Sequence, residues 1–237
     1  VTVCVSWLSR SVITSSKENG FLLSKIMVSF KVSCAITNYK DALHAKNAGA
    51  TAIGMIFYDK SPRYVDIENA KKISMSSSGL KKIGIFVNEN ENIINDIINE
   101  LNLDAIQLHG DESPEFCNNF KVPVIKALSV SKKSDLNVIK NYDVHAILLD
   151  NRTKNQFGGT GKIFNWKVIE NVKFNLPIIL SGGLNEKNIL DGINQINPHA
   201  VDINSGVEKS PGLKSKSKIF RIVKILKQTK KKEFSFG

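Results

Sequence analysis

Short β-branched runs alternate with amphipathic stretches along the chain from about residue 30 onward. A brief apolar run bounded by turn-forming residues predicts a strand, and apolar residues at three-to-four spacing predict a helix. Each predicted strand is followed by a stretch with helical spacing. The predicted strands cover residues 30–36, 51–57, 82–87, 104–108, 122–128, 145–149, 177–180 and 199–203.

Three connecting segments and the last part of the chain carry the clearest helix signals. "YKDALHAKNAG" is predicted to begin after Thr37 and to end at Gly49, and "NEKNILDGINQIN" to begin at a cap on Asn185. The last helix is expected over 214–229. In "NENENIINDIINEL" the predicted apolar face consists of Ile93, Ile94, Ile97, Ile98 and Leu101.

Strands that alternate with helices indicate a parallel sheet. Eight such units in roughly 200 residues favour a closed (β/α)8 TIM barrel in a single domain, because eight parallel strands close around an interior that side chains can fill. An open doubly wound sheet is the structural alternative. It is disfavoured because no GxGxxG follows the first strand.

Length and composition set the limits of this domain. A chain of 237 residues with 42% hydrophobic residues can bury one large core. We expect the barrel over 27–229, preceded by a poorly ordered extension over 1–26 and followed by a basic tail over 230–237. The extension is Ser-rich, acid-poor and followed by Met27, so a transit peptide is the other interpretation. No apolar run approaches the roughly 18 residues of a membrane span.

Charge and cysteine content exclude several function classes. The net charge of +11 is spread along the chain and comes with no nucleic-acid-binding motif, so we expect no nucleic-acid partner. Three widely spaced cysteines form no CxxC pair and suit a reducing, cytoplasmic compartment. Four scattered histidines form no ligand pair, so no metal site is expected.

Two glycine-bearing turns give the strongest functional signal. "LSGGLNEKNI" and "INSGVEKSPG" follow the seventh and eighth predicted strands. In barrels of this kind the loops at these positions often hold a phosphate, because small residues let backbone N–H groups approach it closely. A third turn, "NQFGGTGKIFNW", lacks the spacing of a nucleotide-binding P-loop and is interpreted as a flexible loop over the site.

Three side chains at predicted strand ends are candidates for chemistry. Asp150 ends the apolar run "AILLD", where a carboxylate is costly to bury unless it has a function or a partner. Cys34 ends the first strand, either as a reactive thiol or as a small buried side chain. Arg63 follows the second strand and suits a carboxylate or phosphate, although a solvated loop arginine is equally compatible with the sequence.

These motifs occur in one order and spacing that resembles the phosphoribosylanthranilate isomerases of tryptophan biosynthesis, a branch of aromatic amino-acid biosynthesis. The resemblance covers about residues 30–226. It is carried by the ordered set Cys34 with "ITNYKDA", "AGATAIGMIFYDKSPRYV", "IGIFVNE", "IQLHGDE", "KALSV", "LLDN", "GGTGKIFNW", "LSGGLN" and "VDINSGVEKSPGLK".

The resemblance implies a cofactor-free Amadori rearrangement of a small phosphorylated substrate. N-(5-phosphoribosyl)anthranilate would become 1-(2-carboxyphenylamino)-1-deoxyribulose 5-phosphate, with Asp150 as general acid and Cys34 as general base. By the same resemblance Arg63 would hold the anthranilate carboxylate. The remaining implied substrate contacts are Gln107, His109 and Asp202, and the implied phosphate contacts are Gly182, Gly183, Ser205 and Gly206. The family also occurs fused behind indole-glycerol-phosphate synthase, so association or fusion with that enzyme is an implied partnership.

The first motif departs from the family pattern. The family usually reads Lys-Ile-Cys-Gly, whereas this chain reads "KVSCAIT", with Lys31 three places before the cysteine and Ala35 in place of glycine. Ala35 fits if that position keeps a negative φ or has no close neighbour. The shift of Lys31 implies either a changed side-chain direction or a bulge.

Three other functions are compatible with part of the pattern. The histidine-pathway isomerase performs the same rearrangement but resembles a two-aspartate design, which a cysteine on the first strand disfavours. A barrel that binds the ligand without turnover is the alternative from a different class. A nucleic-acid-binding protein is the third.

Overall fold

The strands form a closed parallel barrel. The computed structural model describes residues 29–32, 35–150, 166–170 and 172–227. Within these ranges eight strands pair in the order β1 to β8, and β1 pairs in parallel with β8. This closure confirms the (β/α)8 TIM barrel and excludes the open sheet. The barrel strands are β1 Ser29–Val32, β2 Ala52–Ile56, β3 Lys81–Phe86, β4 Ala105–Leu108, β5 Val124–Ser129, β6 Ala146–Asp150, β7 Ile178–Leu180 and β8 Ala200–Ile203.

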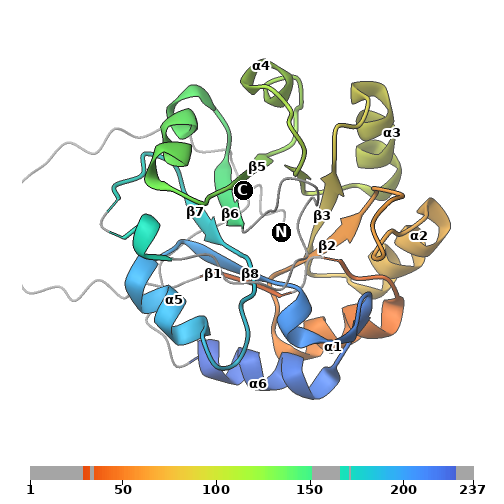
Figure 1. Cartoon of the computed structure of the whole chain (residues 1–237). Helices are drawn as coiled ribbons and strands as arrows, with labels where there is room; N and C mark the ends of the chain where they lie inside the picture. The colour runs from red at the N-terminus through yellow and green to blue at the C-terminus, as the bar shows by residue number, and fades with distance from the viewer. Residues whose placement is uncertain (1–28, 33–34, 151–165, 171, 228–237) are drawn as a thin grey trace, which may run out of the picture.

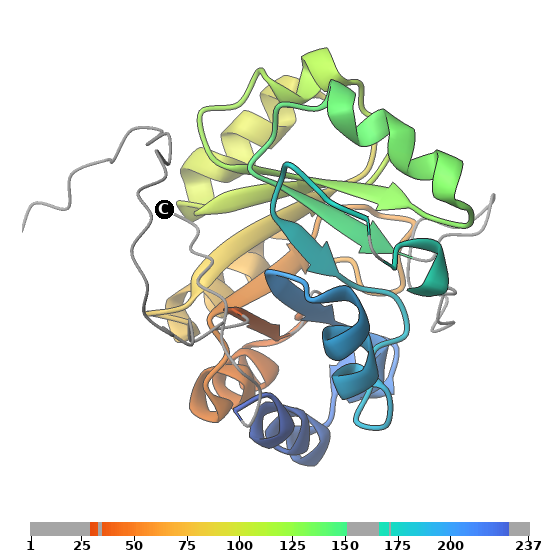
Figure 2. The same ribbon diagram turned by 90° about the vertical axis from the view of Figure 1, so that its left-hand side faces the viewer.

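Helices surround the barrel on its outer side (Figures 1 and 2). The last helix packs beside the first, which closes the outer ring next to the β1–β8 seam (Figure 1). The α-helices are α1 Tyr39–Ala48, α2 Ile67–Ser76, α3 Glu91–Leu101, α4 Pro114–Cys117, α5 Ile189–Ile196 and α6 Lys216–Leu226. Three 3-10 helices complete the described set: η1 Lys133–Asn141, η2 Trp166–Val168 and η3 Ser205–Val207.

The helix ends agree with the sequence signals at some positions and correct them at others. Gly49 ends α1 with a left-handed φ of 101°, as its position predicts. The cap of α1 is Asn38 rather than Thr37, since the Asn38 side chain accepts from the backbone N–H of Asp41. The prediction of Asn185 as the cap of α5 is wrong, because the helix begins three residues later with Asn188 at the cap position.

Three further differences concern burial and strand length. On α3, Ile94, Ile98 and Leu101 are buried, but Ile93 is 47% exposed and lies off the predicted apolar face. The first strand is shorter than predicted, because β1 ends at Val32 and Ala35 has a φ of 66°. A short antiparallel pair, β9 Glu208–Ser210 and β10 Leu213–Lys214, follows β8 and was not predicted.

The core has two layers. Small and branched side chains fill the barrel interior, and a larger apolar layer packs between the strands and the helices. Successive strand residues point to opposite faces, so the interior set shows which strand positions face inward. The interior cluster consists of Ala52, Ile83, Ala105, Ile125, Ala127, Ala146, Leu148, Ile179 and Ala200.

Candidate active site

Three of the predicted site residues lie at the C-terminal mouth of the barrel, and their side chains point inward. Asp150 follows the interior residues of β6 at the same two-residue period, as do Gln107 on β4 and Asp202 on β8. All three are nearly inaccessible, with exposed fractions of 6%, 1% and 4%. Enzymes with this fold place their chemistry at this mouth, so the sequence-based location of the site is supported.

Gln107, His109 and Asp150 form a chain of contacts across the mouth. The side-chain amide nitrogen of Gln107 lies 2.9 Å from Nδ1 of His109. The other ring nitrogen, Nε2, lies 3.3 Å from Oδ2 of Asp150. With the Gln107 amide in this orientation Nδ1 accepts, and in the neutral imidazole Nε2 then carries the proton and faces the carboxylate. His109 therefore aims a donor at the predicted general acid.

A buried ion pair holds the loop that carries His109. Nζ of Lys126 on β5 lies 2.6 Å from Oε2 of Glu112 and also donates to the carbonyls of Leu108 and Gly110. Both side chains of the pair are 2% exposed. The sequence analysis missed this pair, although a lysine inside the apolar run "VPVIKAL" was a signal that could have led to it.

Arg63 is held in a second buried cluster. Its Nε and Nη2 donate to the two carboxylate oxygens of Glu208, at 3.0 and 2.8 Å. Nζ of Lys214 also donates to Glu208 at 2.8 Å. The interpretation of Arg63 as a solvated loop side chain is therefore wrong, because the residue is 7% exposed. Among the described residues, none accepts from its Nη1.

The environment of Glu208 keeps its carboxylate ionised. Burial alone would raise the pKa of Glu208, but hydrogen bonds and positive charge from Arg63 and Lys214 outweigh it, and the pKa lies below its usual value. With two cations around one carboxylate, the cluster keeps a net positive charge, which suits an anionic ligand group. Glu208 and Lys214 are functional candidates that the sequence analysis did not select, although both lie in "INSGVEKSPGLK".

The glycine turns after β7 and β8 interlock. Gly182 and Gly183 have left-handed φ values of 83° and 67°, which explains glycine at both positions. A Cβ added to Gly206 would lie 2.0 Å from the carbonyl oxygen of Leu184. The β8 turn therefore packs directly on the backbone of the β7 turn, and a side chain at Gly206 would separate them.

Polar side chains near α5 fix the shape of the β7 turn. The carbonyl of Gly183 accepts from the side-chain amides of Asn185 and Asn188, each at 3.0 Å. The turn leads directly to the N-terminus of α5, which favours negative charge. Ser205 and Gly206 lie in η3 after β8, so the predicted phosphate-binding residues converge at the mouth.

Four predicted elements lie outside the described residues: Cys34, the Gly-rich segment of "NQFGGTGKIFNW", the extension over 1–26 and the basic tail over 230–237. The register of β1 against β8 is regular from Ser29 to Val32, so no bulge occurs within this stretch. Ala35 meets neither of the two conditions under which alanine was expected to fit, because its φ is 66° and its exposed fraction of 0% shows that it is closely surrounded.

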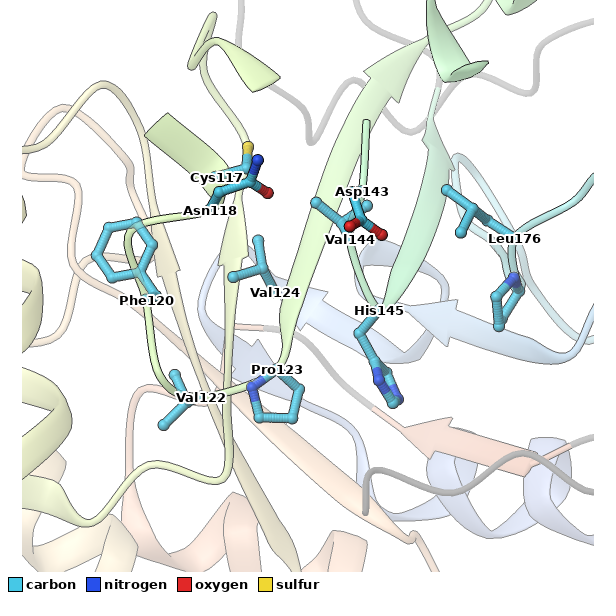
Figure 3. A pocket seen from close by; sticks show the side chains of 11 residues that line it. Cys117, Asn118, Phe120, Val122, Pro123, Val124, Asp143, Val144, His145 and Leu176 are labelled. Atoms are coloured by element: carbon cyan, nitrogen blue, oxygen red, sulfur yellow. The ribbon is translucent and has the colours of Figure 1, made fainter. Parts of the chain in front are cut away.

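A hollow of about 630 Å³ lies at the opposite end of the barrel. It is lined by residues that precede β5, β6 and β7, including Pro123, His145 and Leu176 (Figure 3). The thiol of Cys117 also borders it, and burial raises the pKa of that thiol to about 11, which keeps it protonated and unreactive. The strand N-termini of such barrels serve stability, so this hollow is not the candidate active site.

The described ranges contain neither a metal-site arrangement nor a membrane-spanning helix. No group of three His, Cys, Asp or Glu side chains there has the arrangement of a metal site. None of the helices in those ranges is long and apolar enough to cross a membrane.

The fold and site define a (β/α)8 barrel with a buried carboxylate and two glycine turns at its C-terminal mouth. Residues 31–225 match the family model of N-(5'phosphoribosyl)anthranilate (PRA) isomerase. The chain belongs to the PRA isomerase family. This membership places it among the isomerases of tryptophan biosynthesis.

Individual relatives agree with the family match. The isomerase of Syntrophus aciditrophicus is 44% identical over 188 residues, which cover 78% of this chain and 82% of the relative. That of Pelobacter propionicus is 42% identical over 205 residues, covering 86% and 98%. The crystal structure of the Thermotoga maritima isomerase has a TM-score of 0.78 at 38% identity, covering 84% of this chain and all of that one.

A second solved structure shows what a relative binds. It is phosphoribosylanthranilate isomerase in complex with reduced 1-(o-carboxyphenylamino)-1-deoxyribulose 5-phosphate, with a TM-score of 0.74 and 36% identity over 86% of this chain and all of that one. The ligand of that relative carries a phosphate and a carboxylate, the two anionic groups expected from the glycine turns and Arg63.

Proposed function

We propose that this chain performs an aldose–ketose isomerisation by general acid–base catalysis at the C-terminal mouth of the barrel. N-(5-phosphoribosyl)anthranilate is converted to 1-(2-carboxyphenylamino)-1-deoxyribulose 5-phosphate. The observation that carries the proposal is the contact of His109 with the buried carboxyl group of Asp150, at the same mouth as the interlocked glycine turns. Family membership supports the same reaction.

Asp150 is the proposed general acid. Its proton goes to the ribose ring oxygen, the bond from that oxygen to C1′ breaks, and a Schiff base forms with the anthranilate nitrogen. The carboxylate that remains accepts from Nε2–H of His109. A donor already in place stabilises this charge as it develops, without reorganisation at the moment of reaction.

Cys34 is the proposed general base. Its thiolate removes the C2′ proton from the Schiff base, and the resulting enolamine tautomerises to the ketone. This role rests on the family resemblance, because Cys34 lies outside the described residues. In sequence Cys34 comes two residues after Val32, the last residue of β1, and β1 runs parallel to β8.

The ends of the substrate are held by different parts of the mouth. The phosphate is assigned to the backbone of Gly182, Gly183 and Gly206 with the hydroxyl of Ser205, near the N-terminus of α5. The anthranilate carboxylate is assigned to Nη1 of Arg63, since Nε and Nη2 already donate to Glu208. Gln107 and Asp202 line the ribose between them.

Rescue of a tryptophan-requiring strain that lacks this isomerase tests the proposal. The wild-type chain is expected to restore growth, and Cys34→Ser and Asp150→Asn are expected to fail at equal protein levels. A surface variant on α2, Glu68→Gln, serves as the control that should rescue. Growth with both active-site variants would overturn the assigned roles. Failure of the wild type would favour a barrel that binds the ligand without turnover.

Three coarser proposals concern the setting of the enzyme. We infer a cytoplasmic location from the biosynthetic role of the family, with the barrel domain over 27–229. Association or fusion with indole-glycerol-phosphate synthase remains a proposal from the family resemblance. Co-elution of the two purified proteins in size-exclusion chromatography would support association, and independent elution at high concentration would contradict it.

A further inference from the structure

The ion pair of Lys126 and Glu112 lies behind the active site, where it cannot touch the substrate. Ile125 and Ala127 point into the barrel interior, so Lys126 between them points outward, toward the layer between the strands and the helices. Its side chain is 2% exposed. Neither residue has a role in the proposed chemistry, and no apolar core needs a charge at this depth.

Lys126 donates hydrogen bonds to the backbone on both sides of His109. Its three ammonium protons have three acceptors: the carbonyl of Leu108 at 3.3 Å, the carbonyl of Gly110 at 2.9 Å and Oε2 of Glu112 at 2.6 Å. Leu108 and Gly110 are the residues immediately before and after His109. The ammonium group therefore fixes the peptide groups that orient the imidazole.

Glu112 accepts hydrogen bonds from backbone N–H groups of the same loop and of the neighbouring β3 loop. It accepts from the backbone N–H of Gly110, at 2.9 and 3.1 Å to its two oxygens, and from that of Asn88 at 2.8 Å. A Cβ on Gly110 would lie 2.2 Å from the Asn88 side chain, so the β3 and β4 loops are also in tight contact. The loop around His109 is thus bound through both its carbonyl and its N–H groups.

This arrangement has an energetic consequence. A buried ion pair adds little net stability compared with apolar residues of the same volume, because both charges lose their hydration. The Lys126–Glu112 pair instead holds the loop around His109 in one geometry. The gap of 3.3 Å between His109 and Asp150 is at the outer limit of a hydrogen bond, so a small shift of the loop would break it.

We propose that Lys126 and Glu112 are positioning residues that hold the imidazole of His109 against the carboxyl group of Asp150. The inference rests on the proposed function for its catalytic consequence, but its structural claim concerns His109 alone. Loss of the pair is expected to lower kcat about 10- to 100-fold with little change in KM, since displacement of a catalytic contact acts mainly on the transition state.

Two variants separate positioning from stability. Lys126→Met removes the hydrogen bonds to both carbonyls but leaves Glu112 with its backbone N–H donors. The double variant Lys126→Met with Glu112→Gln removes the unpaired buried charge as well and is expected to recover stability toward the wild type. If the pair acts only through stability, kcat recovers with it. If the pair positions His109, kcat stays low.

A matched control is available on α3. Leu101→Ala truncates a side chain that is 3% exposed at the C-terminal end of α3, where the chain enters the N-terminal end of β4, whereas His109 follows the other end of that strand. The variant therefore destabilises the fold through a cavity away from the mouth. At a temperature well below unfolding, it is expected to keep the kcat of the wild type. An equal loss of kcat in Leu101→Ala would overturn the proposal.

The ring nitrogens of His109 give a readout that does not depend on turnover. In the wild type, ¹⁵N NMR is expected to show an unprotonated Nδ1 and a protonated Nε2, assigned by loss of the signals in His109→Gln. Both Lys126 variants are expected to lose this single-tautomer pattern, and Leu101→Ala to keep it. An unchanged pattern with wild-type kcat in the double variant would overturn the inference. If the wild type has no isomerase activity, the proposed function fails while this signal still decides the positioning claim.

Discussion

The two halves of the mouth are built in different ways. Around β4 to β6 the site consists of side chains in contact: Gln107 with His109, and His109 with Asp150. Around β7 and β8 it consists of backbone, with positive φ at Gly182 and Gly183 and direct packing of Gly206 on the β7 turn. In the proposed reaction the first half supplies the side chain that donates a proton, whereas the second supplies mainly backbone N–H groups and shape, with the side chains of Asp202 and Ser205 beside them.

This difference implies different sensitivities to mutation. In the side-chain half, removal of one functional group should lower kcat and leave ground-state binding nearly unchanged. In the backbone half, addition of a methyl group should weaken binding and raise KM. Arg63 and Glu208 lie between these cases, because a side-chain ion pair there holds a binding group in place.

Asp150→Asn is expected to give the largest effect. An amide cannot supply the proton that opens the ribose ring, so kcat should fall by about 10²- to 10⁴-fold. KM should change little, because the phosphate and carboxylate contacts are intact. Steady-state kinetics with circular dichroism as a check on folding would measure this. A kcat within a factor of about three of the wild type would break the contrast between the halves.

Glu208→Gln is expected to give the next largest effect. It leaves Arg63 and Lys214 without their carboxylate, which costs about 3–5 kcal/mol of unfolding free energy at pH 7. Because the folded pKa of Glu208 is lowered, its stabilisation is complete above an unfolded pKa of about 4.3 and is lost as the pH falls through the folded value. Urea unfolding between pH 3 and 7 should therefore show the two proteins converging in acid.

The control for Glu208→Gln is the exposed ion pair of Glu186 with Arg221. Glu186→Gln is expected to cost less than about 1 kcal/mol, because solvent screens that pair. Equal losses in Glu208→Gln and Glu186→Gln would contradict the view that the buried cluster organises the binding end of the mouth.

Gly206→Ala tests the backbone half. The added Cβ would clash with the carbonyl of Leu184, so the two turns must separate, at a cost of about 1–3 kcal/mol in stability and a rise in KM of about tenfold or more. Gly84→Ala is the control, since its Cβ would meet the side chains of Leu103 and Phe86 in the apolar layer between strands and helices and would not touch the β7 or β8 turn. Isothermal titration with a product analogue would measure binding. Wild-type affinity in Gly206→Ala would contradict the assignment of the phosphate to these turns.

Ala35→Gly is expected to give the smallest effect, with the opposite sign. Ala35 has a left-handed φ of 66°, which costs an alanine about 1–2 kcal/mol, partly offset by the greater freedom of glycine in the unfolded chain. The variant should be more stable by about 0.5–1 kcal/mol. The matched change Ala45→Gly, inside α1, should destabilise by about 1 kcal/mol or more. Destabilisation in both would show that the fold does not need glycine at position 35.

The features that could be predicted from the sequence are those set by the local hydrophobic period or by the order of the motifs along the chain. All eight barrel strands lie where their apolar runs predicted, because a buried strand needs a continuous apolar segment. Asp150 was found because a carboxylate at the end of such a run is conspicuous. The positions of Gly182 and Gly183 were found from the turn composition.

Other features depend on contacts between residues distant in sequence. The pair of Arg63 with Glu208 joins loops that are 145 residues apart, and no local pattern encodes it. The pairing of Lys126 with Glu112 could not be predicted for the same reason, although the lysine itself was visible in an apolar run. The start of α5 was also misjudged, because Asn188 takes the cap position without a side-chain cap bond and the Asn185 side chain accepts from Lys187 in the turn before the helix.

The most direct test of the central claim is turnover of N-(5-phosphoribosyl)anthranilate by the purified chain, followed by its anthranilate-type fluorescence and by ¹³C NMR at C2′. The account predicts fluorescence decay at a rate proportional to protein concentration, with a ketone carbon appearing at C2′, and loss of both signals in Asp150→Asn. Binding of the substrate by the wild type with no fluorescence decay and no ketone would contradict it.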